Sequence, residues 1–154
     1  MQTTYSLHGF SENEQELIKQ TLKDKRGWKS KGYDINYSQV SPDITIELQT
    51  NDQIKREHPS MDNMSYADIR KRQIVINEQL WNQVPEEYPQ NTSLTEYRQY
   101  LINHEMGHQI RKNPFHDHPQ SDDDTQYCPV MHQQYKGGCT LNPWVSRDSI
   151  SIFN

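Results

Sequence analysis

The segment from Ser93 to Pro114 constrains the fold most, because it is the longest stretch of the 154-residue chain with the signals of one continuous helix. Ser93 followed by Glu96 matches a capping box at a helix start. Pro114 lacks the amide hydrogen that a helix interior needs, so we expect the helix to end at Asn113. Residues at steps of four, three and four positions share one of its faces: Tyr97, Leu101, His104 and His108. The fold must therefore contain a long helix with two histidines on one side.

The two histidines belong to the stretch His104-Glu105-Met106-Gly107-His108, which matches the pattern HExxH. Histidines four positions apart on a helix project side by side, so their imidazole nitrogens can bind one zinc ion. Glu105 is rotated from His104 by about 100° around the helix, so its carboxylate can reach a water on the metal without binding the metal. The motif therefore predicts a zinc site with Glu105 as general base. The alternatives are ordinary, partly buried histidines, or a metal bound without catalysis.

A catalytic zinc also needs a third protein ligand and an open position for water. Five of the seven histidines lie between residues 104 and 132, and His116 and His118 follow the predicted helix closely. Side chains two positions apart in an extended segment point to the same side, so the chain must bend to turn only one of them inward. Spacing alone leaves the choice between His116 and His118 open.

The rest of the chain predicts a small sheet and one earlier helix. Residues 3–8 and 73–77 predict short strands, and a capping box at Ser11 and Glu14 predicts a helix that runs to about Arg26.

Apolar and polar residues alternate over residues 33–37 and again over residues 44–48, as in half-buried strands. A Ser-Pro turn separates these segments, so we expect them to pair as a hairpin. Residues 50–68 are polar and irregular, and no long helix is predicted beyond Pro114. Strands, an early helix, a long helix and an irregular tail indicate an α+β fold with a small mixed sheet, in one domain spanning residues 1–154.

The chain is poor in core-forming side chains, since Leu, Ile, Val and Phe together make up 28 of its 154 residues. A net charge of -5 is too small to favour disorder, and nine Tyr and three Trp favour a fold. We expect a small core that a metal or a disulfide stabilises further. The mildly acidic balance argues against nucleic-acid or anionic-lipid partners, and no apolar run is long enough to span a bilayer. The first ten residues lack the basic and apolar regions of a signal peptide.

Two features beyond the long helix are open to more than one interpretation. Cys128 and Cys139 can close a short loop as a disulfide or remain reduced thiols. The acidic run Asp122-Asp123-Asp124 predicts a solvated loop, because a calcium loop places its ligands at alternating positions.

Four stretches, NHEMGH, HDH, CPVMHQQ and GGCTLNPW, resemble a family of bacterial, mostly secreted, metzincin-like zinc peptidases that is catalogued mainly as a domain of unknown function. Other parts of the chain are similar to the same family: Arg26-Gly27-Trp28, QIVIN followed by Trp81, and Tyr97-Arg98-Gln99-Tyr100. The resemblance covers most of the chain. It implies a metzincin-like zincin fold. It also implies secretion, and secretion agrees with the missing signal peptide if the chain is a processed form.

Metzincins hold zinc with the three histidines of HExxHxxGxxH. In this chain Arg111 stands at the glycine position and Pro114 at the third histidine position. An insertion of about four residues would make His118 the third ligand. The resemblance favours His118 over the alternative His116, because the distance along the chain from His118 to Met131 fits the family's spacing better.

Pro129-Val130-Met131 resembles the methionine turn of metzincins, so Met131 is implied to pack beneath the metal without binding it. Tyr135 is the implied candidate for stabilising an oxyanion, the alternative being an exposed loop tyrosine. The family often has cysteines around this turn, so the resemblance implies that a Cys128–Cys139 disulfide braces Met131 in an oxidising compartment.

These residues predict a zinc-dependent endopeptidase in which His104, His108 and His118 bind zinc and Glu105 is the general base. Two other functions remain: a non-catalytic, zinc-stabilised binding or structural module, and a zinc hydrolase of a non-protein amide such as a cell-wall peptide. We expect a monomer that acts on a peptide or protein substrate.

Overall fold

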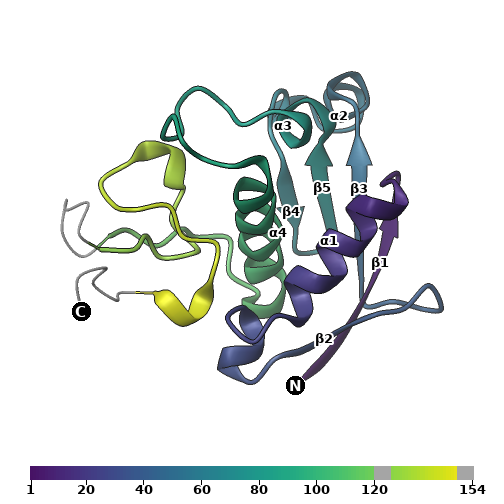
Figure 1. Cartoon of the computed structure of the whole chain (residues 1–154). Helices are drawn as coiled ribbons and strands as arrows, with labels where there is room; N and C mark the ends of the chain where they lie inside the picture. The colour runs from purple at the N-terminus through teal and green to yellow at the C-terminus, as the bar shows by residue number, and fades with distance from the viewer. Residues whose placement is uncertain (120–125, 149–154) are drawn as a thin grey trace.

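The structure of the chain is a computed structural model that describes residues 1–119 and 126–148. Within these residues, five strands form one sheet in the order β2-β1-β3-β5-β4, in which β4 alone runs antiparallel to its neighbour (Figure 1). The strands are β1 (Gln2–His8), β2 (Asp34–Tyr37), β3 (Ile44–Gln49), β4 (Tyr66–Asp68) and β5 (Gln73–Asn77). The α-helices are α1 (Glu12–Lys23), α2 (Asn51–Glu57), α3 (Glu78–Asn82) and α4 (Leu94–Arg111), and short 3₁₀ turns lie at Trp28–Lys31, Pro59–Met61, Gln134–Lys136 and Val145–Arg147. The expected α+β class is confirmed, with a mostly parallel sheet.

The expected hairpin of residues 33–37 and 44–48 is wrong, because β1 lies between the two strands. β2 pairs in parallel with the first half of β1, and β3 pairs in parallel with its second half. The connecting segment crosses β1 near Tyr5, whose carbonyl accepts a hydrogen bond from the amide of Ser38. Alternation of apolar residues predicts a strand but not its neighbour, so the sequence pattern could not reveal this arrangement.

Two short helices, α2 and α3, lie outside the elements predicted from the sequence. A capping box of Thr50 and Gln53 begins α2, and the side chain of Asn77 accepts a hydrogen bond from the amide of Gln79 at the start of α3. Helices of seven and five residues are too short for a clear helical periodicity, so only their capping residues mark them in the sequence.

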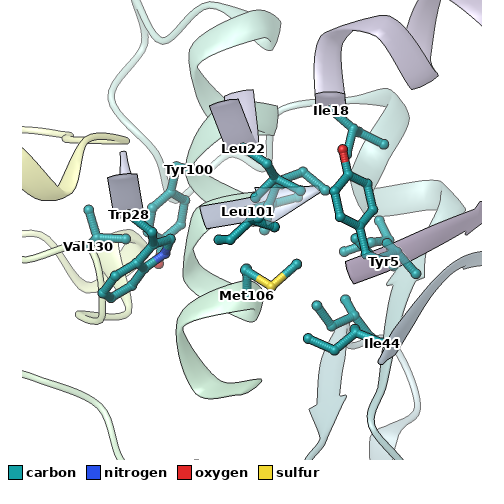
Figure 2. Packing of buried hydrophobic residues seen from close by; sticks show 14 of the residues in the cluster. Tyr5, Ile18, Leu22, Trp28, Ile44, Tyr100, Leu101, Met106 and Val130 are labelled. Atoms are coloured by element: carbon teal, nitrogen blue, oxygen red, sulfur yellow. The ribbon is translucent and has the colours of Figure 1, made fainter. Parts of the chain in front are cut away.

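The main core lies between the sheet and the helices α1 and α4 (Figure 2). Met106 of α4 is fully buried at the centre of this cluster, together with Ile18 of α1 and Ile44 of β3. Successive side chains of a strand point to opposite faces of the sheet, so Val75 lies on the other face, where it forms a small second cluster with Ile54 of α2. The apolar residues are thus concentrated on one face of the sheet.

Helix α4 is buried around its whole circumference from residue 100 to residue 110. The C-terminal region, residues 126–148, is yellow-green in Figure 1 and packs on the side of α4 away from the sheet. The indole of Trp28 donates a hydrogen bond to the carbonyl of Asn103, and the amide side chain of Asn103 donates to the carbonyl of Pro143, each at 2.8 Å. The helix that carries HExxH therefore lies between two regions of the protein. In residues 1–119 and 126–148, no helix has the length and apolar character needed to cross a bilayer.

The absence of a side chain at Gly107 lets the C-terminal region approach α4 closely. A Cβ atom at this position would overlap the sulfur of Met131 and the indole ring of Trp28. Both neighbours are buried, with exposed fractions of 2% for Met131 and 4% for Trp28, so neither can move aside easily. Gly107 is therefore a packing requirement within the HExxH stretch.

We predict that Gly107→Ala lowers the free energy of unfolding by about 1–3 kcal/mol, as overpacking of a filled core does. Thr95→Ala, at an exposed position of the same helix, is the control and should change stability by less than about 1 kcal/mol. Urea denaturation of both variants tests this, and equal stabilities would contradict the close packing at Gly107.

Candidate metal and catalytic site

Three histidines lie together at the side of α4 that faces the C-terminal region. His104 and His108 come from α4, and His116 comes from the segment that follows the helix. One ring nitrogen from each lies within 4.8 Å of the others, and the ring centroids are 5.0–5.1 Å apart. These three side chains could hold a metal ion.

Backbone carbonyls determine which ring nitrogen of the two helical histidines carries hydrogen. Nδ1 of His104 lies 2.8 Å from the carbonyl oxygen of Val130, and Nδ1 of His108 lies 2.7 Å from that of Asn113. A carbonyl oxygen only accepts hydrogen bonds, so each Nδ1 must donate. In the neutral ring Nε2 then keeps its lone pair, which is the form that a metal ligand needs.

Burial keeps these rings uncharged. Desolvation lowers the pKa of His104 to about 3, and it also lowers the pKa values of His108 and His116. A set of three neutral imidazoles is a donor set that suits zinc. The residues present therefore fit the expected metal.

The structure brings His116, rather than His118, to the histidine pair, whereas the resemblance implied His118 as third ligand with His116 as the alternative. The backbone of Asp117 faces the turn after Pro129: its amide donates to the carbonyl of Met131, and its carbonyl lies 3.2 Å from Nδ1 of His132. The exposed ring of His118 lies 6.3 Å from that of His132.

The end of α4 explains how the helix tolerates Arg111 at the glycine position of the metzincin pattern. Lys112, the residue after Arg111, ends the helix in the left-handed backbone conformation, with φ 50° and ψ 43°. The guanidinium of Arg111 instead lies 3.6 Å from the carboxylate of Asp117 in the segment that carries His116. The chain therefore leaves the helix at Lys112.

Glu105 lies beside the histidines as a buried carboxyl group with an exposed fraction of 7%. Desolvation raises its pKa from the ordinary value of 4.5 to about 8. A group with a pKa near neutrality can both accept and release a proton at physiological pH. Glu105 is thus a buried carboxyl group beside the histidines that could transfer a proton.

A cavity of 530 Å³ opens beside these groups. Its wall includes the three histidines and Glu105 together with mainly apolar and aromatic side chains, among them Met64, Leu80, Tyr88, Leu101 and Tyr135. Tyr135 belongs to this wall and is 44% exposed. The histidines and the carboxyl group therefore face a space large enough for part of a peptide.

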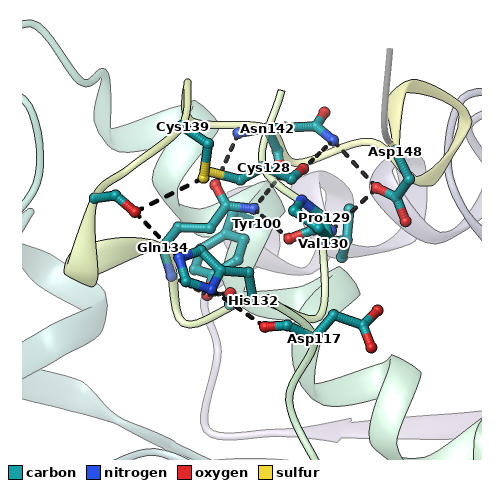
Figure 3. The surroundings of a disulfide bond; sticks show 11 residues. Tyr100, Asp117, Cys128, Pro129, Val130, His132, Gln134, Cys139, Asn142 and Asp148 are labelled. Carbon is teal, nitrogen blue, oxygen red and sulfur yellow. Dashed lines mark hydrogen bonds between the residues drawn. A yellow bond between two sulfur atoms is a disulfide. The ribbon is translucent and has the colours of Figure 1, made fainter. Parts of the chain in front are cut away.

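The C-terminal region forms a tight turn at Pro129, closed by a hydrogen bond from the amide of His132 to the carbonyl of Pro129. Met131 lies in this turn and packs against Gly107. Cys128 and Cys139 form a disulfide that closes the loop containing the turn (Figure 3). Their sulfur atoms also lie near the ring of His132, but they are bonded to each other in the disulfide and are therefore not thiolate ligands for a metal.

Sequence reasoning missed several residues that orient the site. Val130 and Asn113 act through backbone carbonyls, which no side-chain motif reveals. The ring of Tyr100 lies 5.3 Å from the ring of His104. The two residues are four positions apart on one helix, and this sequence spacing could have predicted their contact. The hydroxyl of Tyr100 donates to the carbonyl of His132 and so connects α4 to the turn. The acidic run at residues 122–124 lies outside the described residues.

Comparison with known proteins assigns a family. A family model described as "Protein of unknown function (DUF3152)" matches residues 3–145, so the chain belongs to that family. No curated protein matches it. The solved structure of myroilysin is similar to 78% of this chain at 16% sequence identity, with a TM-score of 0.47. The chain spans about half, 52%, of the length of that structure. A likeness of this extent carries no argument about activity.

We predict that Glu105→Gln stabilises the metal-free protein in a pH-dependent manner. Because the folded state raises the pKa of Glu105 to about 8, ionisation of this group opposes folding. The cost is absent below pH 4.5, where the carboxyl is protonated in both states, and it grows as the pH rises to about 8. The variant should therefore match the wild type at pH 4 and exceed its free energy of unfolding by a few kcal/mol at pH 8, since one pKa unit corresponds to about 1.4 kcal/mol.

Chemical denaturation in the presence of a chelator measures this difference. Thr95→Ala, at an exposed and uncharged position of the same helix, is the control and should show no such growth between pH 5 and 8. A constant difference between Glu105→Gln and the wild type over this range would contradict the burial of an ionisable group at Glu105.

Proposed function

We propose that this chain is a zinc-dependent, metzincin-like endopeptidase whose metal ligands are His104, His108 and His116. One observation carries the proposal: three neutral imidazoles and a buried carboxyl group with a raised pKa meet at the wall of one cavity. A buried structural cluster would leave no space beside it, whereas a hydrolase needs an open position for water and substrate.

The proposed mechanism assigns separate tasks to the residues of the chain. A zinc ion bound to the histidines would lower the pKa of its water to near 7, polarise the scissile carbonyl and, as a positive charge, favour the carboxylate form of Glu105. Glu105 then accepts the proton of the attacking water and delivers it to the nitrogen of the leaving amine. Desolvation raises the pKa of Glu105 in the metal-free protein and the positive charge of a bound zinc would lower it, so the two effects oppose each other.

Two further residues receive supporting roles in this proposal. Met131 packs beneath the histidine-bearing part of α4 at Gly107 and would support the metal site without binding the metal. The hydroxyl of Tyr135 would donate to the negatively charged oxygen that develops on the scissile carbonyl. The apolar wall around Leu101 and Tyr88 favours a substrate with an apolar side chain next to the cleaved bond.

Glu105→Gln tests the mechanism, because it removes the proton acceptor and keeps the side chain's size. We expect the variant to retain zinc at the wild-type stoichiometry and to lose at least about 100-fold in kcat/KM on a quenched-fluorescent peptide library. The control is Glu96→Gln, which should keep full activity. Wild-type rates in the Glu105→Gln protein would overturn the role of Glu105.

The same assay separates the peptidase from the other functions that the residues allow. Zinc without peptide cleavage, combined with loss of the circular dichroism signal on chelation, would identify a zinc-stabilised structural module. Hydrolysis of cell-wall peptides alone would identify an amidase that uses the same metal site.

The third ligand is tested by comparing His116→Ala with His118→Ala, a matched pair two residues apart. Zinc affinity should fall by about 100-fold or more in His116→Ala, since loss of a direct ligand should cost at least as much as loss of an outer partner. His118→Ala should bind within about threefold of the wild type, because its ring points to His132. Competition titration against a chelating dye measures both affinities, and the reverse order would restore His118 as the ligand.

A further inference from the structure

The carboxylate of Asp148 lies behind the turn at Pro129 and has no part in the chemistry described above. Its Oδ1 accepts hydrogen bonds from the backbone amide of Val130 at 3.0 Å and from the side-chain amide of Asn142 at 3.3 Å (Figure 3). The same side chain of Asn142 donates to the carbonyl of Cys128 at 2.8 Å. Asp148 therefore holds the turn through the amide of Val130 and the side chain of Asn142.

Val130 connects this carboxylate to the candidate site. Its N–H donates to Asp148, and its C=O accepts from Nδ1 of His104. The two groups belong to the peptide planes on either side of one Cα atom, so fixing the amide also restricts the direction of the carbonyl.

We propose that Asp148 is a positioning residue for His104. By holding the amide of Val130, it keeps the Val130 carbonyl aimed at Nδ1 of His104, and thereby keeps His104 in the tautomer whose Nε2 is free for a metal. This inference rests on the proposed metal site. It also assigns a function to a residue that lies 44 positions from His104 and belongs to no motif of the sequence.

His108 provides an internal control for this effect. Its Nδ1 donates to the carbonyl of Asn113, at the end of the same helix, and none of the contacts of Asp148 reaches that carbonyl. A change at Asp148 should therefore alter His104 and leave His108 as it is. A general loosening of the protein would alter both rings.

Three variants of the full chain test the proposal: Asp148→Leu keeps a side chain branched at Cγ but has no acceptor, Asp148→Asn keeps Oδ1, and Asp148→Ala serves if the bulkier leucine variant does not fold. Histidine-selective ¹H–¹⁵N spectra of the metal-free protein report the tautomers of His104 and His108. We expect the Nδ1–H form for both rings in the wild type and in Asp148→Asn. In Asp148→Leu, His104 should become a mixture of tautomers while His108 keeps its form.

Zinc affinity gives a second readout. It should fall by roughly 10–100-fold in Asp148→Leu, as for other outer partners of metal-binding histidines, and stay within about threefold of the wild type in Asp148→Asn. An unchanged His104 tautomer in Asp148→Leu, a parallel change at His108, or an Asp148→Asn protein as weak as Asp148→Leu would overturn the proposal. A wild type with the expected tautomers but no affinity for zinc would instead refute the proposed function, because the spectra do not depend on metal.

Discussion

The hydrogen bond between His104 and the carbonyl of Val130 joins the two regions of the protein at the candidate site. On one side of α4 lies the sheet with its apolar core, and on the other lies a region with few apolar residues and little regular structure. This bond orients the ring of His104, and the turn that supplies the carbonyl also carries Met131, which packs against Gly107. The geometry of the site therefore depends on how firmly the C-terminal region is held, and the disulfide and the hydrogen bonds of Gln134, Asn142 and Asp148 hold it.

Burial gives the site its chemical character. Desolvation favours the neutral form of every ionisable group, so it lowers the pKa of His104 and raises that of Glu105. Neutral imidazoles are the form in which histidine binds a metal, and a carboxyl group near its pKa can exchange protons. The same placement of α4 between two regions thus accounts for the neutral candidate ligands and for the raised pKa of Glu105, whose cause is burial.

Much of the fold was predictable from local signals. The errors concern the pairing of strands and a short helix, which local signals do not report. Capping residues and Pro114 locate α4 within two residues at its C-terminal end, because these signals act on the helix itself. The hairpin prediction failed because strand pairing depends on which strand lies next to which, and β1 takes the position between β2 and β3. Helix α2 was missed because seven residues do not carry a readable period.

Helical geometry fixes the relation between residues one and four positions apart, so the pattern HExxH is enough to place His104, Glu105 and His108 on one helix. The approach of His116, rather than His118, could not be predicted from local spacing. It depends on the backbone of Asp117, which hydrogen-bonds to the turn at Met131, a segment distant in the sequence. Local spacing fixes what lies on one helix, whereas contacts between distant segments fix what approaches it.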